Sequence, residues 1–328
     1  MATTLDEHLS LEQADGHYVS LHFPRKMGDI TPIAYGGYAI DLAIQTACQS
    51  VPDEFRLYSA LGHFLRGLST DAKLICTPSE LRRTKSFVTY RVTVQQKDQR
   101  TGMPRLCVEL LADFHRDEPE ILNYSATPTR RYSHWQHCLP WDRLAEEKWV
   151  KTGKLSEAKS DLFNTLFGLS HEIFDASPCP EGVTAQNLLG LVNEIETSQD
   201  QLTPTAKSSA DWFKLKHPLH AEEGQMASLG FALDGLLSFL PLAQNHLSFY
   251  DAEVCASLDF ALRVSVPQPN LNNWHLREAV NHRAGHGRTF SESKLWDEDG
   301  NLIASMSQQS ICELPRAVPN CKELEYGT

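Results

Sequence analysis

The stretch Gly37-Tyr-Ala-Ile-Asp41 returns in altered form as Gly230-Phe-Ala-Leu-Asp234 in the second half of this 328-residue chain. Each copy begins with glycine, carries an aspartate four positions later and enters an apolar run that ends before a proline. Runs that are apolar on nearly every side predict buried helices, here at 37–50 and 230–240. Because internal repetition reveals the architecture of a chain, we expect the same helix-centred unit twice.

A second pair of related stretches follows the two predicted helices. Ala60-Leu-Gly-His-Phe-Leu-Arg66 and Ser257-Leu-Asp-Phe-Ala-Leu-Arg263 align without a gap. Each half also has a candidate first strand before its helix and two strand-like runs joined by a turn after it. The predicted strands are 18–23, 86–96 and 105–114 in the first half, and 211–215, 288–296 and 302–312 in the second. These patterns predict an α+β fold of two similar units, in each of which an antiparallel sheet encloses one helix.

The two units are predicted at residues 1–118 and 186–328, the second carrying the active site. Residues 119–185 between them differ in composition, because they are rich in Pro, Ser, Thr and charged residues. Helical spacing is possible at 142–150 and 154–167. We therefore expect a partly helical connecting segment that is laid over the surface.

Composition excludes several classes of function. The formal net charge is −12 and no long basic block occurs, so a nucleic-acid partner is not expected. No run of about 18 apolar residues is present and the first residues do not look like a secretory signal, which favours a cytoplasmic protein without a membrane span. The eight cysteines are spread singly, which argues against a zinc site or a disulfide framework. We expect no metal and no cofactor.

Two helices, each wrapped by a curled antiparallel sheet, resemble the double-hotdog acyl-CoA thioesterases of the bacterial thioesterase II type and their fungal relatives. The resemblance leaves out the connecting segment and implies a thioester hydrolase acting on an acyl-CoA or a carrier-bound acyl chain, with a role in lipid metabolism or secondary metabolite biosynthesis. The matching stretches are Tyr35-Gly36-Gly37, Leu61 to Arg66, Arg82 to Phe87, Ala232-Leu-Asp234, Ala256 to Asp259, Trp274 and Asp299 to Gln308.

The resemblance implies that Asp234, Ser257 and Gln308 together hold the attacking water. The residues themselves support part of this, because a carboxylate in an otherwise apolar helix is costly unless it is hydrogen-bonded or useful. As a base, Asp234 could take a proton from water or orient it. The alternative is structural, because Asp234-Gly235 is also a turn-forming pair. Asp41, the counterpart of Asp234 in the repeat, is a possible second site.

Substrate binding is expected at five further positions. Backbone N–H groups at a helix N-terminus, beside Gly36 and Gly37, could meet a developing oxyanion. His63 could touch the substrate, although a strand histidine is as often structural. Phosphates of the substrate need local cations, and Arg66 and Arg263 are candidates. Further basic residues near strand ends could serve the same purpose, or be solvated charges that protect sheet edges; they are Arg82, Arg83, Lys85, Arg283 and Arg288.

Two departures from the family pattern leave the substrate open. The chain has Asp259-Phe260 where these thioesterases commonly have Asp-His, and Ser257 replaces the more usual threonine. One alternative is therefore a hotdog enzyme retooled for cyclisation, release or dehydration of a polyketide-like intermediate. Another is a non-catalytic acyl-chain binder. The chain is expected to be a monomer or to form homo-oligomers through its sheets.

Overall fold

The computed structural model describes residues 4–28 and 33–313, and its strands form one 12-stranded sheet. Neighbouring strands are antiparallel throughout. The order across the sheet is β1 (Leu11–Ala14), β2 (His17–Ser20), β4 (Ile75–Arg83), β5 (Phe87–Lys97), β6 (Pro104–Arg116), β3 (Phe55–Phe64), β9 (Val254–Val264), β12 (Leu302–Glu313), β11 (Arg288–Asp297), β10 (His275–Gly285), β8 (Ser208–Leu215) and β7 (Phe174–Pro178).

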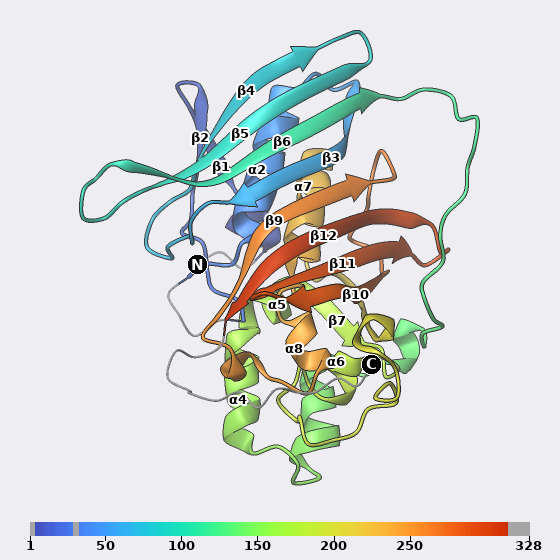
Figure 1. Ribbon diagram of the computed structural model, residues 1–328. Helices are drawn as coiled ribbons and strands as arrows, with labels where there is room; N and C mark the ends of the chain where they lie inside the picture. The colour runs from blue at the N-terminus through green and yellow to red at the C-terminus, as the bar shows by residue number, and fades with distance from the viewer. Residues whose placement is uncertain (1–3, 29–32, 314–328) are drawn as a thin grey trace.

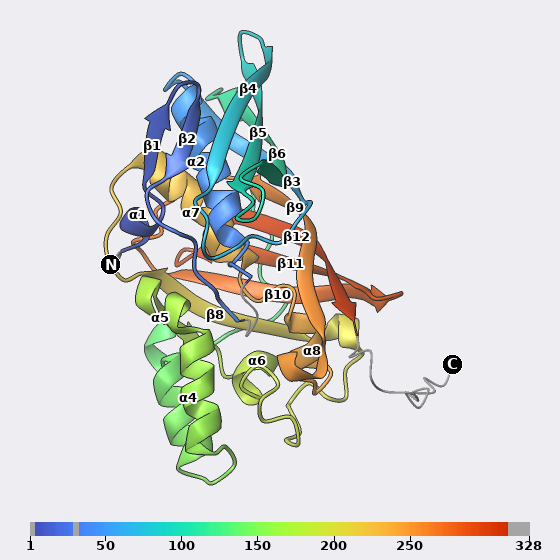
Figure 2. The ribbon, with the colours of Figure 1, turned by 90° about the vertical axis from the view of Figure 1, so that its left-hand side faces the viewer.

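Two long buried helices, α2 (Gly37–Ser50) and α7 (Glu222–Asp234), lie side by side against one face of this sheet (Figures 1 and 2). They run antiparallel, because the start of α2 lies beside the end of α7. Gly230 permits their close approach, since a Cβ atom there would lie 2.5 Å from Cγ2 of Ile40. The apolar side chains of each helix are therefore buried on two sides, by the sheet and by the other helix.

The two halves of the sheet join at β3 and β9, where Ser59–His63 pair with Asp259–Arg263. These strands carry the related stretches 60–66 and 257–263. The first half thus places α2 against β1–β6, and the second half places α7 against β7–β12. The predicted α+β double hotdog is confirmed.

The prediction of a second helix at 230–240 is wrong at both ends. Helix α7 begins at Glu222 and ends at Asp234, because Gly235 is extended (ψ 131°) and Leu236 has a φ of 75°. The sequence stays apolar after Asp234 because the following residues line a cavity. As a result Gly37 opens α2 whereas Gly230 lies inside α7, so the repeated pentapeptides do not occupy equivalent places.

The segment between the halves is partly helical and forms a layer at one end of the molecule (Figure 1). It builds a small apolar core of its own around Trp141, Trp149 and Phe163. The boundaries at 118 and 185 stay predictions, and β7 inside this range pairs with β8 at the sheet edge. The shorter helices of the chain are α1 (Leu5–His8), η1 (Trp135–His137), α3 (Trp141–Leu144), η2 (Ala145–Val150), α4 (Glu157–Leu166), α5 (Gly168–Ile173), α6 (Val183–Gln186), η3 (Pro204–Ala206), α8 (Leu240–Gln244) and η4 (Phe249–Asp251).

Length and hydropathy of the helices bear on membrane insertion. Across residues 4–28 and 33–313, none of them is both long and apolar enough to cross a bilayer.

Candidate active site

A cavity of about 390 Å³ lies where the two halves and the connecting segment meet. The first half contributes the loop before α2 and the end of β3, and the second contributes the end of α7, the loop after it and the start of β9. Side chains of three parts of the chain therefore face one space. Its polar and apolar lining includes Met27, Tyr35, Gly36, Phe64, Arg66, Phe167, Asp234, Leu236, Ser238, Phe239, Cys255 and Ser257.

Asp234 closes α7 and is the buried acid of this cavity, with 6% of its surface exposed. Nε2 of Gln308 donates a hydrogen bond to its Oδ1 over 2.6 Å. Burial raises the pKa of Asp234 to about 6, although the hydrogen bonds from Gln308 and from the backbone N–H of Gly37 act in the opposite direction. Because carboxylates are stabilised at helix N-termini, the amino end of α2 suits this acid.

Gly36 and Gly37 let the start of α2 come this close. A Cβ atom on Gly36 would lie 2.9 Å from the ring of Phe64 and 3.1 Å from Oδ2 of Asp234. A Cβ atom on Gly37 would collide with the ring of Tyr35. Glycine at both positions is thus required by close packing around the acid.

Gln308 lies on β12 and is almost fully buried. Because its amide NH₂ donates to Asp234, its Oε1 points elsewhere, and this atom is buried without a hydrogen-bond partner among the described residues. A buried acceptor without a partner is costly. Asp234 thus faces the cavity, and the amide of Gln308 that adjoins it carries an unused acceptor.

Ser257 lines the same cavity but takes part in a different set of hydrogen bonds. Its hydroxyl lies 3.2 Å from that of Ser238, which lies 2.9 Å from that of Ser310. Ser310 is the cross-strand partner of Ser257. The structure thus joins Asp234 directly to Gln308 and places Ser257 in a chain of three hydroxyls. Sequence reasoning missed Ser238 and Ser310, and no motif marks either of them.

The other predicted site residues divide into two groups. Gly36 and Arg66 line the cavity, and Gly37 supplies an N–H to Asp234. His63 is exposed on β3, and the next residue, Phe64, lines the cavity. Because successive side chains of a strand point to opposite faces, His63 faces away from the cavity. Arg263 lies at the seam, where its guanidinium donates to Oγ of Ser59. His63 and Arg263 are therefore not brought to the cavity.

Asp41 is also not part of this cavity. It is buried in α2, 2% exposed, and its Oδ2 has no hydrogen-bond partner among the described residues. Burial raises the pKa of Asp41 well above its usual range. Its position in the second turn of α2 differs from that of Asp234 at the end of α7, so the second site predicted there gains no support from the repeat.

The cavity is bounded on one side by residues of both halves and by Phe167 of the connecting segment. Tyr35, Met27, Phe167 and Leu236 separate it from a hollow of about 30 Å³ with mainly aromatic walls. Arg277 borders that hollow, where it forms a bidentate ion pair with Asp211 at 2.7 and 2.9 Å.

The end of α7 is held from two sides. Arg277 also donates to the carbonyl oxygen of Ala232 over 2.6 Å, and Tyr35 donates to that of Phe231. These bonds satisfy carbonyls that a helix C-terminus leaves without partners. They fix Asp234, two residues further on.

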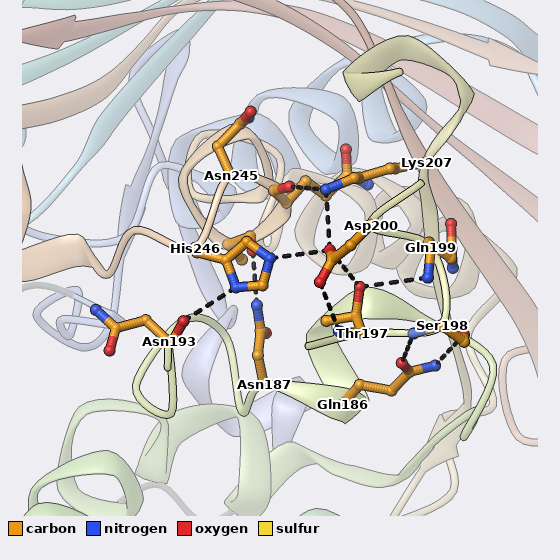
Figure 3. Close-up of polar contacts among 12 residues, drawn as sticks. Gln186, Asn187, Asn193, Thr197, Ser198, Gln199, Asp200, Lys207, Asn245 and His246 are labelled. Carbon is orange, nitrogen blue, oxygen red and sulfur yellow. Dashed lines mark hydrogen bonds and ion pairs between the residues drawn. The ribbon is translucent and has the colours of Figure 1, made fainter. Parts of the chain in front are cut away.

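A second polar cluster supports the cavity from behind without lining it. Figure 3 shows His246 and Lys207 turned towards Asp200, at 2.9 and 3.2 Å. Burial opposes ionisation of Asp200, yet hydrogen bonds from Thr197, His246 and Lys207 hold its pKa below the usual range. Lys207 also donates to the carbonyl oxygen of Gln244, at the end of α8. The cluster thus ties residues 197–207 to the helix that follows the cavity-lining loop.

Within the ranges that the structure describes, no group of three or more His, Cys, Asp or Glu side chains could hold a metal ion.

Comparison with known families gives matches over both halves. The family model for the acyl-CoA thioesterase N-terminal domain matches residues 23–115, and that for the C-terminal domain matches residues 174–312. Together they cover more than two thirds of the chain. A search of curated proteins gave no significant match.

Solved structures share the fold at low sequence identity. An acyl-CoA thioesterase II, TesB2, from Mycobacterium marinum is 20% identical with a TM-score of 0.66, and the match covers 96% of this chain and all of that one. A thioesterase II structure from Thermobifida fusca is 15% identical, with a TM-score of 0.67 and coverage of 94% and 97%. A hotdog protein of unknown function from Alicyclobacillus acidocaldarius is 12% identical, with a TM-score of 0.65 and coverage of 95% and 98%.

Proposed function

The chain belongs to the acyl-CoA thioesterase family, and from this premise we propose that it hydrolyses an acyl-CoA thioester at Asp234. The observation that carries the proposal is the buried, cavity-lining carboxyl of Asp234 beside the start of α2, which is hydrogen-bonded to Gln308. A buried acid with a raised pKa in a cavity is typical of catalytic sites.

The proposed reaction is a direct attack by water. The Asp234 carboxylate and Oε1 of Gln308 accept the two hydrogens of one water molecule, which turns its oxygen lone pair towards the thioester carbon. Asp234 takes one proton as the C–O bond forms. The tetrahedral intermediate then collapses, the C–S bond breaks, and the proton passes to the departing thiolate. The products are a carboxylic acid and free coenzyme A, and no covalent acyl-enzyme is needed.

The start of α2 supports the charge that develops on the carbonyl oxygen. The positive end of the helix dipole lies there and favours an oxyanion, and the N–H of Gly37, which donates to Asp234, lies at the same point. Ser257 and Ser238, which also line the cavity, supply further hydroxyl donors.

Arg66 is the cavity-lining cation that we assign to the coenzyme A phosphates. It is exposed and lies just after β3, at the outer end of the cavity. In a chain with a net charge of −12, a local cation is needed to attract an anionic substrate. The acyl chain then extends inward towards Phe167 and Leu236.

The test is hydrolysis of a panel of short, medium and long acyl-CoA thioesters. We expect Asp234→Asn to lower kcat by about 100-fold or more, the usual share of a general base. Asp41→Asn is the matched control, because it removes a buried carboxyl on the neighbouring helix that does not line the cavity. Loss of activity in the control alone would contradict the assignment to Asp234.

No turnover by the wild-type protein, with all thioesters intact, would exclude acyl-CoA hydrolysis. Products of cyclisation or dehydration from a carrier-bound thioester would then support the retooled enzyme. Binding without any product would support the acyl-chain binder.

A further inference from the structure

Two cysteines face each other across β9, which lines the cavity, and its neighbour β12. Cys255 on β9 and Cys312 on β12 are direct cross-strand partners. Both are half-buried, so a small oxidant can reach them. Cys255 also lines the cavity itself.

The backbone places this pair at the kind of register that suits a disulfide. The N–H of Cys312 donates to the carbonyl oxygen of Gly287, on the β11 side and away from β9. Cys255 and Cys312 are therefore a non-hydrogen-bonded pair, in which Cα atoms lie about 4.5 Å apart. Disulfides span Cα separations of about 4.4–6.8 Å, so the pair can be bridged without moving the strands apart.

The same pair is connected to the hydroxyl chain of the candidate site. The thiol of Cys255 lies 3.0 Å from the carbonyl oxygen of Ser238, whose hydroxyl contacts both Ser257 and Ser310. Ser257 and Ser310 are themselves the next cross-strand pair with side chains on that face. A change at Cys255 is thus transmitted to Ser238, and through it to Ser257.

We propose that Cys255 and Cys312 are a redox modification site, which a peroxide converts into a disulfide in the cavity wall. The Cys312 thiolate attacks hydrogen peroxide to give a sulfenic acid and hydroxide. The Cys255 sulfur then attacks the sulfenic sulfur, the S–S bond forms, and the released hydroxide and the thiol protons leave as water. Two thiols lose two electrons and two protons, and one peroxide becomes two molecules of water.

The environment of Cys312 favours the first step. The Cys255 thiol lowers the pKa of Cys312 to about 7 when its proton turns from the Ser238 carbonyl to Cys312, although burial acts against this. The thiolate is the nucleophilic form of cysteine. A substantial fraction of Cys312 is then reactive near neutral pH.

The disulfide is expected to slow hydrolysis, a consequence that rests on the proposed function. Drawing Cys255 towards Cys312 removes its contact with the Ser238 carbonyl and displaces the hydroxyl chain that ends at Ser257. Because a small displacement of a positioning group is costly in a catalytic site, we expect kcat to fall by about tenfold. Reduction with dithiothreitol is expected to restore it.

The first experiment tests the bond itself and needs no activity. The full chain is treated with hydrogen peroxide, alkylated and digested without reductant, and its peptides are mapped by mass spectrometry. We expect the Cys255 and Cys312 peptides joined, lighter by two hydrogen atoms than the two thiols. Alkylation of both cysteines after treatment, or pairing of either with another cysteine, would overturn the proposal whether or not the protein hydrolyses thioesters.

The second experiment follows thioester absorbance before and after peroxide treatment, with the peroxide removed. Cys312→Ser is expected to keep the basal rate and lose the inhibition. Cys138→Ser is the control, because Cys138 is also half-buried and lies beside Cys179, away from the cavity; it should stay sensitive. Inhibition that persists in Cys312→Ser would contradict the link between this disulfide and activity.

Discussion

At the scale of single residues, the carboxyl of Asp234 is subject to two opposing effects. Burial favours its neutral form, whereas Gln308 and the N–H of Gly37 favour the carboxylate. The balance leaves the pKa at about 6, so the group is ionised at neutral pH and can still accept a proton. A general base works best when its pKa lies near the operating pH.

Activity is therefore expected to rise with pH and to level off above a midpoint of about 6, since only the carboxylate accepts a proton. In Gln308→Ala the carboxylate loses a stabilising hydrogen bond, so the midpoint should move to higher pH. The rate at neutral pH should fall by about 10- to 100-fold, the value of a hydrogen bond to a charged group. Profiles of kcat/KM against pH check this; an unchanged midpoint would show that Gln308 does not act through Asp234.

The same pKa predicts an effect on stability. An unfolded Asp titrates near 3.8, and Asp234 in the fold titrates near 6, so the fold binds the proton more tightly. The contribution of the Asp234 proton to the free energy of unfolding is therefore fully present below about pH 4. This contribution is lost as the pH rises through about 6. Asp234→Asn should stabilise the protein by up to about 3 kcal/mol at pH 7.5 and hardly at pH 4. Urea unfolding at both pH values measures this, and equal changes at both would contradict it.

At the scale of elements, the connecting segment determines the depth of the cavity. The turn between α4 and α5 places Phe167 beside Leu236, and the two side chains separate the cavity from the aromatic hollow behind it. The composition and spacing of residues 119–185 predict only a partly helical segment laid over the surface. In the structure, Phe167 of this segment also lines the cavity.

Phe167→Ala is accordingly expected to join the cavity to the hollow and to shift the preference towards longer acyl chains. Removal of a buried ring leaves space that apolar ligands can fill. Competition between acyl-CoA thioesters of different chain length measures the shift in relative kcat/KM. Phe174→Ala is the matched control, since Phe174 borders only the hollow and its ring packs on Phe213 and Phe231. The same shift in both variants would show that Phe167 is not the barrier.

At the scale of the whole molecule, one continuous sheet and one helix pair link the two halves. Gly62 lies at the seam, where a Cβ atom would come within 2.4 Å of the ring of Phe260 on β9. The departure from the family pattern at Phe260 is thus accommodated by a glycine on the adjoining strand. A larger side chain on either strand at this point would therefore require the other strand to move.

We therefore expect a single unfolding transition in calorimetry, and a Gly62→Val variant in which that whole transition moves to lower temperature. Overpacking of this kind costs about 1–3 kcal/mol. Gly168→Ala is the control, because open space surrounds that position and little change is expected. Two separate transitions, with only one affected by Gly62→Val, would show that the halves unfold independently.

Local pattern was enough to predict much of this protein. The bounds of α2 agree with the prediction at 37–50, and the hairpins of both halves lie close to their predicted ranges, because apolar periodicity and turn residues act over a few positions. An acid in an apolar run also marked Asp234 from the sequence. The resemblance to a family added Gln308, which the structure joins to Asp234 although the roles of both remain a proposal.

Tertiary structure decided what depends on distant partners. The end of α7 at Asp234, the outward direction of His63 and the isolation of Asp41 follow from packing that no local pattern contains. Ser238 and Phe167 reach the cavity only because a loop and the connecting segment fold back over it. The sequence by itself thus determined which elements form, since these depend on neighbours along the chain. Which side chains share a cavity depends on contacts between residues tens to hundreds of positions apart, and only the folded chain brings them together.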